Sequence, residues 1–95
     1  MNKVILEHIE ITPESGGKPR IAGHRIKVQD VAIWYEEMNL SPHEIVEQYP
    51  MITLSDVHAA LAYYYDNKQE IRAAIQEDEL LEAQMRANIP SKLQE

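Results

Sequence analysis

Residues 16–27 read Gly-Gly-Lys-Pro-Arg-Ile-Ala-Gly-His-Arg-Ile-Lys and hold all three glycines of the chain and four of its nine lysines and arginines. The rest of the 95-residue chain is acidic, since the formal net charge of the whole is −7. A basic segment with glycines in an acidic protein indicates a tight hairpin, a surface that faces anions, or both. The choice between these interpretations decides the local fold and much of the function.

The segment itself predicts a small hairpin. Two short runs, residues 18–21 and 25–28, flank Ala22-Gly23-His24, where Gly23 would adopt a positive φ. Because side chains alternate along a strand, the apolar residues would face the core and the cations would lie mainly on the outward face. The core-facing residues would be Ile21, Ile26 and Val28, and the outward-facing cations would be Lys18, Arg20, Arg25 and Lys27.

The hairpin is preceded by a strand pattern and followed by a helical one. Residues 7–12 alternate polar and apolar side chains and are rich in β-branched residues, which predicts a half-buried strand that Pro13 ends. Apolar residues then recur at three- and four-residue spacing from Val28 to Met38, which predicts the first helix. Tyr35 belongs to its apolar face, so we expect a place for it in the core.

Two further helices begin at clear capping signals. Ser41 is an N-cap candidate, Pro42 suits the first helical position and Glu44 completes a capping box, so the second helix runs from there to about Tyr49. Thr53 is the N-cap candidate of the third helix, with Asp56 as its partner. The apolar face of this third helix would be Leu54, Val57, Leu61 and Tyr64, and its exposed residues would be Ser55, Asp56, His58, Ala59, Ala62 and Tyr63.

The fourth helix closes the fold. Asp66 or Asn67 can cap it, and it continues to about Asn88, before Pro90. One side of it carries Ile71, Ala74, Ile75, Leu81, Met85 and Ile89, a stripe that requires a packing partner. The sequence therefore predicts an α+β fold, mostly α, in which a strand and a short β-hairpin precede a trihelical core and a C-terminal helix.

Length and composition bound the class of protein. A chain of 95 residues allows one small domain, with the strand, hairpin and trihelical core in residues 1–66 and the C-terminal helix and tail in residues 67–95. The absence of cysteine excludes disulfides and thiolate chemistry and favours a reducing compartment. Neither a signal peptide nor about 18 consecutive apolar residues occur, so we expect a cytoplasmic protein without membrane association.

The second and third helices are joined by residues 50–53, which is the spacing of a helix-turn-helix, and the first helix would complete a trihelical unit. The alternative is that short helices simply pack on one another. The would-be recognition helix contains neither Lys nor Arg, so phosphate contacts would have to come from the hairpin, whose cations could equally form a solvated face. The predicted DNA-binding residues are Lys18, Arg20, His24, Arg25, Lys27, Ser55 and His58.

Enzymatic and metal-binding patterns are weak. The four histidines are dispersed, and the helical pair His43 and Glu47 supplies at most half of a metal site. No serine elbow motif and no phosphate-binding glycine loop occur. We therefore predict no catalytic residues, no metal, no cofactor and no small-molecule substrate.

Aromatic residues point to self-association. Tyr63, Tyr64 and Tyr65 are consecutive, and three adjacent helical positions cannot all be buried by one small core. Tyrosine and tryptophan are favoured at interfaces. We expect Tyr64 to fill the core, and we expect Trp34, Tyr63 and Tyr65 to form the interface of a homodimer.

The chain also resembles the bacterial domain-of-unknown-function family numbered 433. The resemblance lies in Ile11-Thr12-Pro13, Gly17 to Gly23, Arg25-Ile26, Val28 to Asp30, Leu40-Ser41-Pro42, Glu44-Ile45, Tyr49-Pro50, Leu54 with Val57, and Ala59 to Asp66. The core Gly-Lys-Pro-Arg-Ile-x-Gly-x-Arg-Ile is specific. Two positions depart from the usual pattern, since His24 stands where Thr is usual and Lys27 where Pro is usual.

The resemblance implies a homeodomain-like or winged helix-turn-helix protein of the VapB type, an antitoxin encoded beside a PIN-like ribonuclease toxin. It implies operator DNA as one partner and that toxin as another. The residues expected to bind the toxin are Ile71, Arg72, Ile75, Leu81, Met85 and Arg86. The alternative from the residues alone is a homodimeric adaptor that contacts only proteins, which the net charge of −7 favours.

Overall fold

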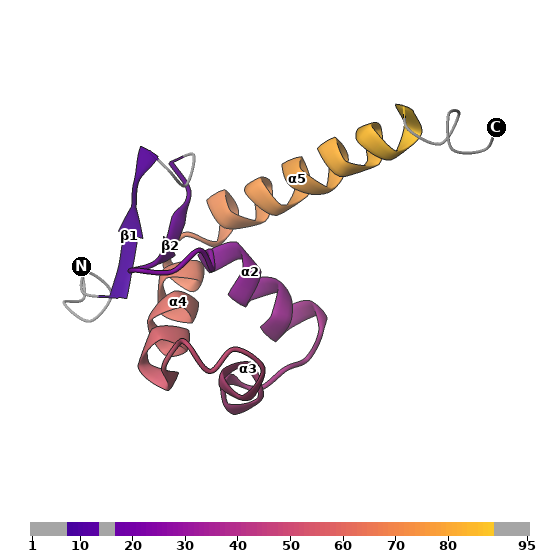
Figure 1. Ribbon diagram of the computed structural model, residues 1–95. Helices are drawn as coiled ribbons and strands as arrows, with labels where there is room; N and C mark the ends of the chain where they lie inside the picture. The colour runs from indigo at the N-terminus through magenta and orange to yellow at the C-terminus, as the bar shows by residue number, and fades with distance from the viewer. Residues whose placement is uncertain (1–7, 14–16, 89–95) are drawn as a thin grey trace.

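A computed structural model describes residues 8–13 and 17–88. Two short strands come first and helices follow (Figure 1). The elements are β1 (Ile9–Ile11), β2 (Pro19–Ile21), α2 (Val28–Ala32), the π-helix η2 (Ile33–Glu37), α3 (Pro42–Gln48), α4 (Leu54–Asp66) and α5 (Lys68–Asn88). The α+β, mostly helical class and the order of elements predicted from the sequence are confirmed.

The pairing of the strands differs from the predicted hairpin. β1 pairs with β2 in an antiparallel register that places Ile9 opposite Ile21. The chain does turn back after β2, where the Ile21 N–H donates to the Ile26 carbonyl at 2.9 Å, but residues 25–28 form only an isolated bridge between Arg20 and Lys27. A strand there is wrong because Val28 already begins α2.

The first helical segment changes its winding half-way. α2 begins where the Asp30 carboxylate accepts the Lys27 N–H at 3.0 Å, and it continues into η2. There the Met38 N–H donates to the Ile33 carbonyl at 3.1 Å, a bond that spans five residues instead of four. The wider turn shifts the helical period, so Tyr35 is 36% exposed, and the expectation that it fills the core is wrong.

The starts of α3 and α4 follow the local sequence. Ser41 Oγ accepts the Glu44 N–H at 3.2 Å while Glu44 Oε1 accepts the Ser41 N–H at 2.9 Å. Thr53 and Asp56 form the same reciprocal pair at 3.1 and 2.9 Å before α4. Both predicted capping boxes are confirmed, because these bonds satisfy backbone donors within a single turn.

α4 is the centre of the fold. It contacts α2, α3, α5 and both strands, and Val57, Leu61 and Tyr64 are buried on its core face. Ala59 is buried too, which corrects its predicted exposure: a helix covered from several directions hides more than one stripe. The buried apolar cluster consists of Ile9, Ile21, Val28, Val31, Ala32, Ile45, Ile52, Val57, Ala59, Ala60, Leu61, Tyr64, Ile71 and Ile75.

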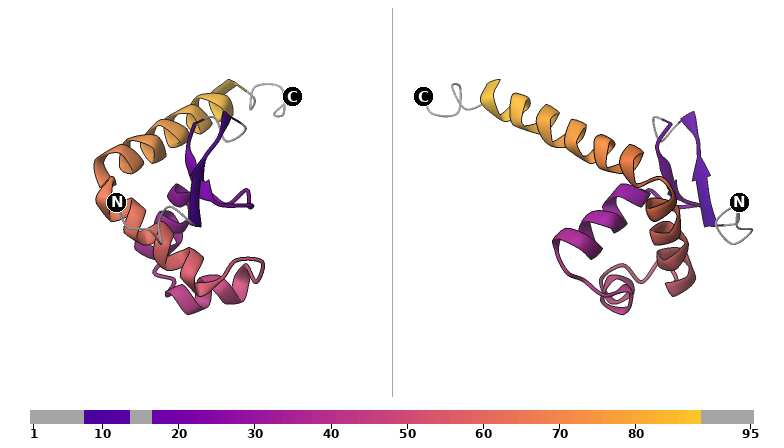
Figure 2. Two further views of the ribbon diagram at one scale, coloured as in Figure 1. Left: turned by 90° about the vertical axis from the view of Figure 1, so that its left-hand side faces the viewer. Right: turned by 180° about the vertical axis from the view of Figure 1, so that it is seen from behind.

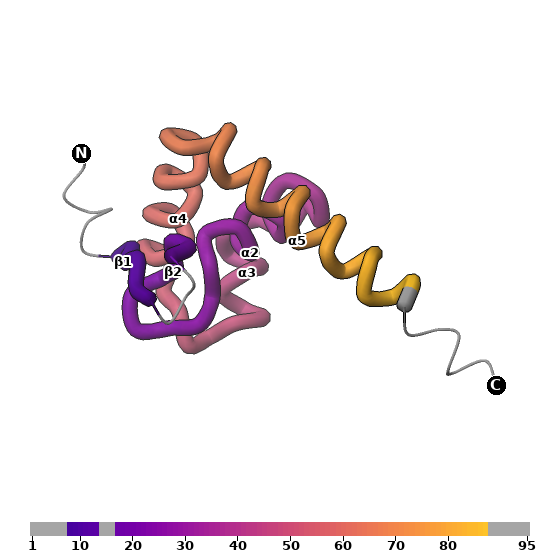
Figure 3. The backbone as a smooth tube through the Cα atoms, turned by 90° about the horizontal axis from the view of Figure 1, so that it is seen from above, coloured from indigo at the N-terminus to yellow at the C-terminus, as the bar shows by residue number. Residues whose placement is uncertain are grey.

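α5 packs on this core only at its beginning. Ile71 and Ile75 are each 2% exposed, whereas Leu81 and Met85 are 55% and 56% exposed. The views of Figures 2 and 3 agree that the rest of α5 projects away from the other helices and from the sheet. Ile89, the last member of the predicted stripe, lies outside the described residues. Within those residues, no helix is both long and apolar enough to span a membrane.

Candidate nucleic-acid and partner-binding surfaces

The first hairpin cation, Lys18, is turned toward α5. Its Nζ donates to the two carboxylate oxygens of Asp78 at 2.8 and 3.0 Å. The buried Gln29 also donates to Asp78, from Nε2 to Oδ2 at 2.6 Å. The Lys18 and Gln29 hydrogen bonds hold the pKa of Asp78 below its ordinary value. Lys18 therefore serves first to fix the middle of α5 against the hairpin and α2.

The second cation, Arg20, faces its strand partner. Arg20 Nε lies 3.4 Å from Glu10 Oε1, and the two residues are directly opposite in the sheet. The same oxygen accepts the Gly23 N–H at 2.8 Å, and Gly23 has the predicted positive φ, at 80°. The Glu10 carboxylate thus closes the turn that follows β2 and neutralises part of the basic segment.

The other residues of the basic segment differ in exposure. Lys27 is half-buried at the N-cap of α2, and His24 is half-buried in the turn. Arg25 is exposed, and no ion pair within the described part of the chain involves it. The predicted outward face therefore offers Arg25 most directly to an anion.

The exposed side of α4 is uncharged at its N-terminal end. Ser55 and His58 are exposed, as expected, and the sequence has no Lys or Arg from residue 28 to residue 67. The Asp56 carboxylate instead has two partners within the fold. Its Oδ1 lies 2.6 Å from His8 Nδ1, and its Oδ2 accepts the Thr53 N–H at the cap of α4. Burial would raise the Asp56 pKa, but its hydrogen bonds with Thr53 and His8 outweigh burial and lower it. The Asp56 carboxylate therefore already has its hydrogen-bond partners within the chain.

The aromatic residues expected at a dimer interface all have places within the chain. Trp34 stacks on Tyr49 with ring centroids 4.2 Å apart and an interplanar angle of 11°. Tyr63 is half-buried against the core. Tyr65 is exposed, and its hydroxyl donates to Glu36 at 2.9 Å. Among these three residues, Tyr65 is the most exposed, and its ring contacts Tyr64 and lies below Lys68 Nζ.

Glu36 is the acceptor of two tyrosines. The Tyr64 hydroxyl donates to Glu36 Oε1 at 2.5 Å, beside the bond from Tyr65 to Oε2. These two bonds lower the pKa of Glu36. Burial, together with the Glu36 bond, raises the pKa of Tyr64 to about 12. As expected, Tyr64 fills the core, while its hydroxyl reaches the rim of the structure.

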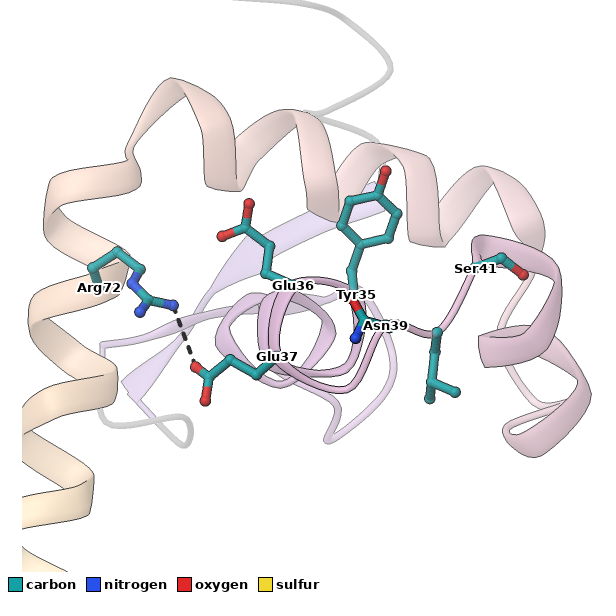
Figure 4. A pocket seen from close by; sticks show the side chains of 7 residues that line it. Tyr35, Glu36, Glu37, Asn39, Ser41 and Arg72 are labelled. Carbon is teal, nitrogen blue, oxygen red and sulfur yellow. Dashed lines mark hydrogen bonds and ion pairs between the residues drawn. The ribbon is translucent and has the colours of Figure 1, made fainter.

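Next to these tyrosines lies a shallow hollow (Figure 4). Its lining residues are Tyr35, Glu36, Glu37, Asn39, Leu40, Ser41 and Arg72. Arg72 Nη1 donates to Glu37 Oε2 at 3.3 Å across it, and Asn39 has a positive φ of 59°. The partners of Glu36 and Glu37 are about thirty residues away or more in the sequence, so the local sequence gives no signal for these contacts. Among the described residues no three His, Asp or Glu side chains are placed to hold a metal ion.

The residues expected to bind a toxin separate into three pairs. Ile71 and Ile75 belong to the core, which corrects the expectation that they contact a partner. Arg72 is held by Glu37, and Arg86 pairs with Glu82 one turn earlier on the surface of α5. The exposed apolar members of the set are Leu81 and Met85.

Comparisons with known proteins agree on the family. The model of the DUF433 family, described as proteins of unknown function, matches residues 9–64, from β1 to nearly the end of α4. No curated protein matches the chain. The crystal structure of a DUF433 member from Anabaena variabilis is similar, with 32% sequence identity, a TM-score of 0.66, and coverage of 78% of this chain and 73% of that one. The chain belongs to the DUF433 family.

Proposed function

We propose that the chain is the antitoxin of a type II toxin–antitoxin pair, a cytoplasmic protein that catalyses no reaction. Its projecting helix α5 would neutralise a PIN-like ribonuclease, and its helix-turn-helix core would bind operator DNA for autoregulation. The observation that supports this most is that α5 extends beyond the core (Figure 1). Its residues Leu81 and Met85 are exposed. The resemblance noted in the sequence supplies the toxin class.

The anchoring of α5 suits a docking helix. Its first half is fixed by Ile71, Ile75 and the ion pair of Asp78 with Lys18, so its direction is set by the fold. Beyond that point, nothing in the described residues covers Leu81 and Met85. An amphipathic helix held in this way can lay its apolar side into a groove of another protein, a common mode of recognition.

The family match adds a second argument. It ends at residue 64, so α5 lies after the matched part of the chain. Between members of one family, an element that contacts one particular partner is expected to differ more in sequence than the core that supports it. Arg86, exposed at the far end of α5, would suit the carboxylates of a nuclease active site, since guanidinium pairs bidentately with carboxylates.

The DNA-binding part of the proposal rests on the arrangement of α3, α4 and Arg25. α3 and α4 are joined by a short turn, and Ser55 and His58 are exposed on the first turns of α4. Arg25 would add a phosphate contact from the neighbouring turn. In gel shifts with the promoter of its own gene, Arg25→Ala should weaken binding and reduce its dependence on salt.

A homodimeric adaptor without DNA binding is the second candidate. It is favoured by the ion pairs that Lys18 and Arg20 already make with Asp78 and Glu10. The same gel shifts separate the two candidates. No shift at low salt would favour the adaptor, whereas a shift that Arg25→Ala weakens would favour the regulator.

A further inference from the structure

We infer that the projecting half of α5 recognises an apolar groove whose rim carries Lys or Arg side chains. Leu81 and Met85, called here the apolar stripe, would enter the groove, and Glu77 and Glu82 would pair with the rim. The inference rests on the proposed function, in which such a rim is the RNA-binding surface of the ribonuclease. α5 and RNA would then compete for one surface.

The positions of the carboxylates relative to the stripe carry this inference. Glu77 comes four residues before Leu81, and Glu82 comes three residues before Met85, so each carboxylate neighbours one member of the stripe on the helix surface. The two lie on opposite sides of the stripe, given the helical rotation per residue. All four side chains are exposed. The stripe is therefore bordered by negative charge on both sides.

This border argues against a second copy of the chain as the occupant. Two α5 helices packed stripe to stripe would bring Glu77 and Glu82 toward the same carboxylates of the other copy, and like charges in an interface repel. The apolar contact would also be small, because the exposed large apolar side chains on this half of the helix are Leu80, Leu81 and Met85, and Leu80 lies about 100° around the helix from Leu81. A partner with positive side chains beside an apolar groove removes both difficulties.

A ribonuclease offers this combination of chemistry. A protein that binds RNA holds phosphates with Lys and Arg, and the same side chains pair with carboxylates. Glu82 already pairs with Arg86 in the free chain, but both side chains are exposed, and an exposed pair of this kind contributes little free energy. A cation on the partner can therefore replace Arg86 at Glu82.

The test is the affinity of the chain for the ribonuclease encoded beside it, measured by calorimetry at two salt concentrations. The double variant Glu77→Gln, Glu82→Gln should bind roughly tenfold more weakly and depend less on salt, as expected for the loss of charged contacts at an interface rim. Glu79→Gln is the matched control. It removes one carboxylate charge, as each substitution of the double variant does, from a residue that lies two positions before Leu81 and does not face the stripe. Its affinity for the ribonuclease should therefore equal that of the wild type.

RNA supplies the second readout. A non-cleavable oligonucleotide should reduce binding of the wild-type chain in proportion to its own affinity for the ribonuclease. If the wild type binds the ribonuclease but the double variant binds it as tightly as Glu79→Gln does, the inference fails and the proposed function stands. The same holds if RNA does not compete with the chain for the ribonuclease. If the wild type does not bind the ribonuclease, the proposed function fails and the inference with it. Self-association that Leu81→Ala abolishes would also overturn the inference, by showing that a second copy covers the stripe.

Discussion

Lys18 Nζ lies 2.8 Å from Asp78 Oδ1, and this contact joins the start of β2 to the point where α5 leaves the core. The two residues are 60 positions apart in the sequence. Because Lys18 cannot contact both Asp78 and a DNA phosphate at full strength, the same side chain links the proposed DNA surface to the position of the proposed toxin-binding helix.

Asp78→Asn should therefore increase affinity for operator DNA. The change removes the ion pair between Lys18 and Asp78 and one negative charge near the basic segment, so we expect a gain of severalfold at low salt, with a steeper salt dependence. Gel shifts at several salt concentrations measure it, with Glu79→Gln as the control for loss of charge alone. Unchanged affinity in a folded Asp78→Asn chain would mean that Lys18 takes no part in DNA binding.

Stability should fall in acid. The pKa of Glu36 is below its ordinary value of 4.5 because of its bonds with Tyr64 and Tyr65, and that of Asp78 is below 3.8 because of Lys18 and Gln29. A carboxyl whose pKa is lower in the folded state stabilises the fold above its unfolded pKa, and this contribution is lost as the pH falls through the folded pKa. Urea unfolding should therefore give a free energy that decreases from about pH 5 downward.

Glu36→Gln tests the origin of this dependence. The amide cannot titrate, so the unfolding free energy of the variant should change less between neutral and acid pH than that of the wild type. Gln48→Ala, an exposed change on α3 that removes no titratable group, serves as the control and should keep the wild-type slope in acid. Equal slopes for Glu36→Gln and the wild type would show that the tyrosine bonds do not perturb this carboxyl.

The two halves of α5 should respond differently to truncation. Ile75→Ala opens a cavity in the core and should cost roughly 2–5 kcal/mol of unfolding free energy. Leu81→Ala should change it by no more than about 0.5 kcal/mol, because the side chain is exposed. Chemical denaturation measures both. A large loss for Leu81→Ala would indicate that the projecting half packs on the body.

The capping box of α4 gives a local test of the fold. Thr53→Ala removes the hydroxyl that accepts the Asp56 N–H and should lower the unfolding free energy by about 1 kcal/mol. Ser55→Ala, an exposed hydroxyl two residues later, is the control and should have a smaller effect. Similar losses for the two variants would contradict the capping role of Thr53.

Features that depend on neighbouring residues could be predicted from the sequence. Ser41 with Glu44 and Thr53 with Asp56 are three residues apart, so the chemistry that starts α3 and α4 is visible in the chain. The positive φ of Gly23 is likewise a local requirement of its turn. These predictions succeed because the partners are fixed by spacing alone.

Features that depend on distant partners could not be predicted. Whether β2 pairs with β1 or with residues 25–28 depends on where α2 begins, and the widening of η2 that exposes Tyr35 has no signal in the apolar spacing. The apolar residues of α5 from Ile71 to Met85 look like one continuous face in the sequence, yet the buried core ends between Ile75 and Leu81. The internal pairing of the hairpin cations depends on contacts such as that with Asp78.

The central claim is that the exposed half of α5 neutralises a ribonuclease. The most direct measurement is the rate of RNA cleavage by the PIN-like protein encoded beside the chain, as the chain is added. The wild type should stop cleavage near equimolar ratio, while the variant Leu81→Asp, Met85→Asp, still folded by circular dichroism, should leave most of the activity. Cleavage that continues at full rate with excess wild-type chain would contradict the claim.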